Sequence, residues 1–84
     1  MSKIYLDVHV PGIARTYEFA VDNAMTVGNV KRQFTSQISA VEGRQVFADN
    51  KKVLFCSQTL EGLLQDSELL GEVGVTGGDT IILL

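Results

Sequence analysis

The chain holds one cysteine and one histidine, residue types that can pair as a thiol nucleophile and its base. Cys56 and His9 fall in different predicted strands, and nothing in the sequence argues that the two side chains meet. We therefore interpret Cys56 as a small core or strand residue, and His9 as exposed on the outer face of its strand. A lone histidine without cysteines or carboxylates at ligand spacing does not indicate a metal site.

The C-terminal third contains two further groups of residues that invite a chemical interpretation. Four acidic residues predict a solvated face, with a patch for a basic partner as the alternative: Glu61, Asp66, Glu68 and Glu72. Four glycines lie close together near the end of the chain, but no Gly-Lys-Ser/Thr comes after them, so they do not predict a phosphate-binding loop: Gly71, Gly74, Gly77 and Gly78. The sequence thus predicts no enzyme activity, no catalytic residue, no cofactor and no metal ion.

Length and charge narrow the function classes. With 84 residues, the chain is expected to form one domain over residues 1–84. Its formal net charge is −3 and its seven lysines and arginines are scattered, which disfavours nucleic-acid binding and a polybasic membrane anchor. No apolar run approaches the roughly 20 residues that cross a bilayer. The first seven residues carry charge where a signal peptide would be apolar. A single cysteine fits a reducing compartment, so we expect a cytoplasmic protein.

The stretch from Thr26 to Gly43 predicts the helix around which the rest is organised. Apolar residues recur at three- and four-residue spacing, which makes one helical face: Val27, Val30, Phe34, Ile38 and Val41. Polar residues fill the wet sides: Lys31, Arg32, Gln33, Thr35, Ser36 and Gln37. Thr26 suits the N-cap and Gly43 the position after the last turn, while Gly28 weakens the first turn.

The remaining segments predict strands. Alternation over residues 4–10 and 16–21, with turn chemistry at Pro11-Gly12 between them, indicates an antiparallel hairpin. Later strands are expected at 52–57, 63–64 and 80–84, with a short helical turn within 66–74. Residues 44–52 are not assigned to an element, although Val46 or Phe47 could anchor a loop under the helix C-terminus.

The last predicted strand is apolar on both faces, which favours a central place in the sheet. Beside the first strand it would run parallel to it, because the segment between them supplies the long crossover that parallel pairing requires. The sequence therefore predicts an α+β fold of order β-β-α-β-β-β, in which a mixed sheet packs on one helix. This is the β-grasp arrangement.

The tail from Leu70 to Leu84 resembles the ending "L-x-x-x-G-I-x-x-G-D-x-I-x-L" of ubiquitin-like proteins. In that interpretation, Leu70 and Val75 plug the core at a tight turn, and Gly78-Asp79 reverses the chain before the central strand. The resemblance implies a ubiquitin-like β-grasp fold over essentially the whole chain.

A narrower resemblance is to the bacterial YukD and EsaB proteins associated with type VII (WXG100) secretion. The opening Leu6-Asp7-Val8-His9-Val10-Pro11-Gly12-Ile13, followed by Tyr17-Glu18-Phe19, is similar to their "V-D-V-x-V-P-x-I…Y-D-F" start. Residues 53–57 and 63–64 resemble their third and fourth strands. The resemblance implies a cytoplasmic, non-enzymatic accessory of the secretion machinery.

Two alternatives remain open. A ubiquitin-like modifier or sulfur carrier ends in Gly-Gly, whereas Gly77-Gly78 precedes the last strand and the sequence ends at Leu84, which disfavours conjugation. The other alternative is the adaptor domain of a larger ubiquitin-like protein.

An apolar patch is expected on the open face of the sheet. If Ile81, Leu83, Val53 and Phe55 face the helix, then alternation turns Leu54, Ile82 and Leu84 outward. Tyr5 is expected to flank this patch. Clustered apolar exposure is typical of interfaces, so the patch predicts a protein partner, with a homodimer through the same face as the competing outcome.

Overall fold

Helix α1 (Val27–Glu42) begins and ends at its predicted capping residues in the computed structural model, which describes residues 2–84. The Thr26 hydroxyl accepts a hydrogen bond from the Asn29 amide at 3.2 Å, which satisfies a donor of the first turn. Gly43 follows with a φ of +71°, a left-handed conformation that glycine adopts at low cost. Four residues of the predicted apolar stripe are buried: Val27, Val30, Phe34 and Ile38.

The buried face of α1 differs from the predicted one at the C-terminal end of the helix and along one side of the stripe. Val41, expected in the apolar stripe, is 68% exposed, whereas Lys31 and Thr35, expected on the wet sides, are buried. The buried arc extends to Lys31 because the segment around Asp66 packs on that side: the Gly28 amide donates to the Asp66 carbonyl at 2.9 Å. These three expectations are wrong because periodicity places a stripe on the helix but not the elements that cover it.

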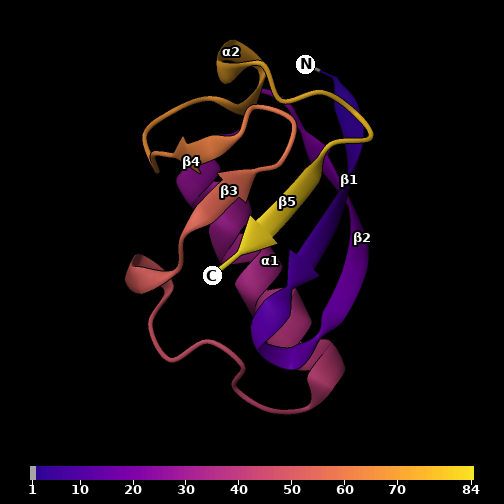
Figure 1. Ribbon diagram of the computed structural model, residues 1–84, viewed down its shortest axis with the longest axis vertical. Coiled ribbons are helices and arrows are strands. Elements are labelled where there is room, and N and C mark those ends of the chain that lie inside the picture. Colours follow the sequence, from indigo (N-terminus) through magenta and orange to yellow (C-terminus); the bar gives the residue numbers. More distant parts are fainter. Residues whose placement is uncertain (1) are drawn as a thin grey trace.

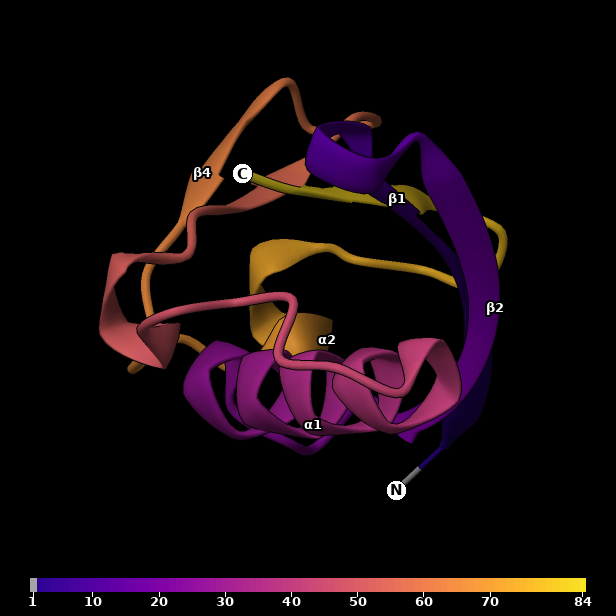
Figure 2. The same ribbon diagram turned by 90° about the horizontal axis from the view of Figure 1, so that it is seen from below.

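The strands of the described residues form one sheet in the order β2-β1-β5-β3-β4. Their bounds are β1 (Lys3–Val10), β2 (Arg15–Asp22), β3 (Phe55–Ser57), β4 (Gly62–Leu64) and β5 (Thr80–Leu83). β1 and β2 form the predicted hairpin, and β5 lies centrally, parallel to β1 and antiparallel to β3. Figure 1 shows α1 behind this sheet, and Figure 2 shows the sheet curving around the helix. The predicted α+β fold and its mixed sheet are confirmed.

Short elements connect the strands. Pro11–Ile13 forms a turn of 3₁₀ helix, η1, at the predicted hairpin turn, a second, η2, spans Asn50–Lys52, and α2 spans Leu70–Val73. Val46 and Phe47 pack against the core between α1 and η2. β3 begins at Phe55 and is shorter than predicted.

The core lies between α1 and the inner face of the sheet. The Phe34 ring on α1 stacks on Phe19 of β2 at 4.6 Å and on Phe55 of β3 at 6.1 Å between ring centroids. Leu70 and Val75 are 0% and 3% exposed, which confirms that they plug the core beside the last strand. The inner face of the sheet is thereby filled, and the outer face is left open to other contacts.

Candidate functional site

Cys56 and His9 lie in one row across the outer face of the sheet. His9 is opposite Ile82, Ile82 is opposite Cys56, and Cys56 is opposite Leu63. His9 and Cys56 are therefore two interstrand spacings, or ~10 Å, apart, and Ile82 lies between them. A nucleophile and its base need hydrogen-bond distance, so this arrangement does not provide a catalytic pair.

Each of the two residues has a local explanation. His9 Nδ1 lies 2.9 Å from the Thr16 Oγ1 on β2, so the half-buried ring is tied to its neighbouring strand. Burial raises the pKa of the Cys56 thiol, which keeps it protonated and weakens it as a nucleophile. Cys56 is thus a strand residue, as expected, and its side chain lies on the outer face.

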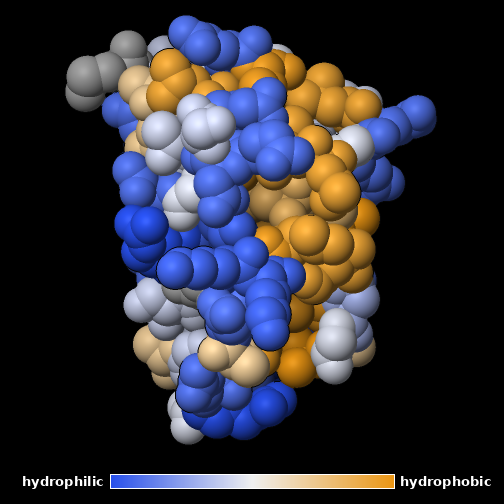
Figure 3. Space-filling model, turned by 90° about the vertical axis from the view of Figure 1, so that its left-hand side faces the viewer, coloured by the Kyte–Doolittle hydropathy of each residue, from blue (hydrophilic) through white to orange (hydrophobic). Residues whose placement is uncertain are grey.

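Apolar side chains flank this row. Leu54 and Leu84 form a backbone pair that exchanges two hydrogen bonds, of 3.2 and 3.0 Å, two register positions from the Cys56–Ile82 pair and therefore on the same face of the sheet. Together they make what we call the open-face patch: Leu54, Cys56, Leu63, Ile82 and Leu84. Leu54, Leu63 and Leu84 are 46%, 54% and 60% exposed, while Cys56 and Ile82 are half-buried. Seen from the β4 side, Figure 3 shows hydrophobic residues gathered in a band along one side of the molecule.

Tyr5 lies apart from the open-face patch. The register of β1 places His9 beside Ile82, so Tyr5 stands four residues, or ~13 Å, further along the strand. Tyr5 is 53% exposed, the Lys3 ammonium lies 5.7 Å from the centroid of its ring, and its carbonyl accepts from the Gly78 amide at 2.8 Å. The structure thus brings three of the four predicted site residues together and leaves Tyr5 at the other end of β1.

A buried carboxylate holds the turn before β5. Asp79 is 4% exposed and accepts hydrogen bonds from the Ser57 hydroxyl at 2.6 Å and the Thr59 amide at 3.2 Å. Burial alone would raise the pKa of Asp79, but these hydrogen bonds outweigh it and hold the pKa below its ordinary value. The hydrogen bond between Ser57 and Asp79 ties β3 to β5 beneath the open-face patch. The sequence signal for this contact was Ser57, a polar residue at an inward-facing strand position.

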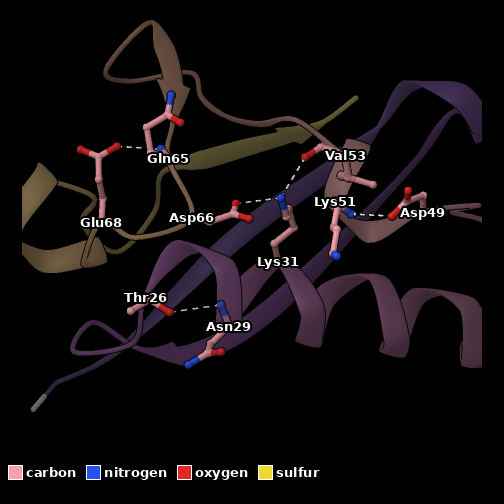
Figure 4. A network of polar contacts seen from close by, with 9 residues as sticks. All are labelled: Thr26, Asn29, Lys31, Asp49, Lys51, Val53, Gln65, Asp66 and Glu68. Atoms are coloured by element: carbon pink, nitrogen blue, oxygen red, sulfur yellow. Dashed lines mark hydrogen bonds and ion pairs between the residues drawn. The ribbon is translucent and has the colours of Figure 1, made fainter.

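A second polar centre joins α1 to the loop after β4. Lys31 is 5% exposed, and its Nζ donates to the Val53 carbonyl at 3.1 Å and to the Asp66 carboxylate at 2.8 Å. Figure 4 shows these contacts converging between α1, the segment between η2 and β3, and the segment that follows β4. In the same segment the Glu68 carboxylate accepts from the Gln65 amide at 2.6 Å. The acidic cluster therefore divides: Asp66 pairs with Lys31 on α1, and Glu68 accepts a hydrogen bond within its own loop.

Neither a metal site nor a membrane-spanning helix is found among the described residues. No group of three or more His, Cys, Asp or Glu side chains in residues 2–84 is placed to hold a metal ion. None of the helices described above has the length and hydrophobicity that crossing a bilayer requires.

Comparison with known proteins places the fold. No family model matches the chain, and no curated protein matches its sequence. The ubiquitin-like domain of PLXNC1 superposes with a TM-score of 0.81 at 16% identity, covering 99% of this chain and 98% of that one. The ubiquitin-like domain of an Arabidopsis thaliana protein gives 0.71 at 25% identity, covering 100% and 78%. Caldiarchaeum subterraneum ubiquitin gives 0.70 at 20% identity, covering 98% and 91%.

These likenesses agree with the sheet order, the central parallel β5 and the single long helix. The chain has the ubiquitin-like β-grasp fold.

Proposed function

We propose that this chain is a non-enzymatic protein-binding module whose contact surface is the open-face patch. The observation that carries the proposal is the contiguity of its apolar side chains, which lie on three neighbouring strands or directly beside their ends, with Leu54, Leu63 and Leu84 each more than two-fifths exposed. Exposed apolar residues that cluster favour an interface, since burying them against a partner removes apolar surface from water. The ubiquitin-like fold supports a general protein-interaction module.

The biological setting that we propose is a bacterial type VII (WXG100) secretion system, in which the chain acts in the cytoplasm as an accessory or regulator. The support is the resemblance of the β1–β2 hairpin, of residues 53–57 and of residues 63–64 to YukD and EsaB. A gene neighbourhood with WXG100 proteins and a secretion ATPase would support this setting, and its absence would count against it.

The test of the surface is capture of the products of the neighbouring genes by the immobilised chain. We expect Leu54→Asp and Ile82→Asp each to abolish capture, because a buried carboxylate opposite an apolar partner is strongly unfavourable. Val41→Asp is the matched control: Val41 is 68% exposed but lies on α1, away from the patch. Circular dichroism establishes that the variants fold. Undiminished capture by both patch variants would refute the assignment of this surface.

A homodimer through the same patch is the competing outcome. Sedimentation at several concentrations separates the two, because self-association raises the mass with concentration and Leu54→Asp would reverse the rise. If the chain is a monomer at every concentration, the homodimer is refuted and the patch is left to bind a different protein.

A further inference from the structure

A cleft of about 390 Å³ adjoins the open-face patch where β3 and β4 cease to pair. Their ladder ends with Phe55 opposite Leu64, and the chain on either side separates beyond this point. Two leucines of the patch, Leu54 and Leu63, also line the cleft. A partner that covers the patch is therefore in reach of the cleft.

A buried cation lines this cleft. The Lys31 ammonium has three N–H donors, and the Val53 carbonyl and the Asp66 carboxylate accept from two of them. Lys31 has a side chain only 6% exposed, whereas that of Asp66 is 60% exposed. The charge pair is thus buried on the side of the lysine and open to solvent on the side of the acid.

A second cation stands at the same place. Lys51 is exposed, lines the cleft and also lines an adjoining hollow of about 280 Å³ together with Lys31 and Asp66. In the part of the chain that the structure describes, Lys51 forms no ion pair. Figure 4 shows its side chain directed toward α1. The charged residues that line the two hollows are three basic and two acidic: Lys31, Arg32, Lys51, Asp49 and Asp66. This corner is therefore positive on a chain whose net charge is −3.

We propose that the partner segment that covers the open-face patch carries an acidic side chain, which enters this cleft and pairs with Lys51 and the remaining N–H of Lys31. The inference rests on the proposed function, because Leu54 and Leu63 belong to both surfaces. A large apolar side chain of the segment lies on these leucines, and the carboxylate follows one or two residues away. Charge complementarity selects an acid for this position and disfavours a base.

The experiment uses peptides from a random library displayed on phage and selected on the immobilised chain, then synthesised with a fluorescent label. We expect enrichment of Asp or Glu one or two residues from a large apolar residue. Lys51→Glu should weaken these peptides by roughly 5- to 20-fold, since it removes an attraction and adds a repulsion. Lys3→Glu makes the same change of charge at the far end of β1, and it should change the affinity for these peptides by no more than about twofold. Replacing the acid of the peptide by lysine should restore binding to Lys51→Glu.

The outcomes that overturn the inference separate it from the proposed function. Peptides that lose binding with Leu54→Asp but respond equally to Lys51→Glu and Lys3→Glu would refute the acidic contact and leave the patch standing. Peptides that bind Leu54→Asp as well as the unaltered chain would refute both, and so would a selection that enriches no peptide.

Discussion

Replacing Asp79 by alanine removes the acceptor that joins the turn before β5 to β3. The Ser57 hydroxyl, on a residue that is 1% exposed, loses its acceptor at a cost of about 1–3 kcal/mol. The Thr59 amide is nearer to solvent, and its loss costs about 1 kcal/mol or less. We therefore expect Asp79→Ala to lower the free energy of unfolding by about 1–4 kcal/mol. A domain of this size typically has only ~4–13 kcal/mol in total.

Urea denaturation followed by circular dichroism measures this loss. Asp7→Ala, which removes an exposed acid from the outer face of β1, is the control and should stay within about 0.5 kcal/mol of the unaltered chain. If Asp79→Ala is as stable as the control, the carboxylate does not hold the two strands together and the reasoning is refuted.

The pH dependence tests the charge of Asp79 separately. Because its folded pKa lies below the ordinary value, the ionised carboxylate contributes stability that is fully present above the unfolded pKa of ~3.9 and is lost as the pH falls through the folded pKa. The difference in unfolding free energy between the unaltered chain and Asp79→Asn should therefore be constant from pH 7 to about pH 5 and shrink below about pH 4. A difference that stays flat down to pH 2 would contradict the lowered pKa.

Three further predictions concern other contacts. Gly28→Ala should destabilise the chain by about 1 kcal/mol despite the better helix propensity of alanine, because its Cβ would lie 3.1 Å from the Asp66 Cβ and 3.2 Å from the Asp66 carbonyl oxygen; urea denaturation decides the sign. Tyr17→Phe should cost about 1 kcal/mol in the same assay, because the hydroxyl donates to the Glu42 carboxylate, and an unchanged midpoint would contradict this. Cys56 should react with iodoacetamide at pH 8 more slowly than an unfolded control peptide, because its raised pKa lowers the thiolate fraction; equal rates would contradict the burial of the thiol.

The sequence predicted the elements whose signals are local. The stripe from Val27 to Ile38 and the two-sided apolarity of residues 80–83 placed α1 and the central strand correctly. The burial of Lys31 could not be predicted in this way, because it depends on the loop around Asp66, which lies 35 residues further along the chain.

Prediction of the candidate site had a similar limit. Alternation turns Leu54 and Leu84 outward whatever their neighbours are, and the structure brings them together as predicted. Leu63 can be added to the predicted patch only when the register between β3 and β4 is known. That register depends on a turn in which Glu61, a non-glycine residue, has a φ of +56°. The wrong placement of Tyr5 has the same origin, because only the register of the parallel pair fixes its distance from Ile82.

The central position of β5 also has a consequence for biosynthesis. Strands β1 and β3 pair with residues 80–83 and not with each other, so the sheet stays divided until that segment has left the ribosome. Until then, the side of α1 that the finished sheet will cover is exposed to water in the nascent chain, and so are two unpaired strand edges. We infer that closure follows translation of the last strand, and that a ribosome stalled before residue 80 would display an aggregation-prone intermediate.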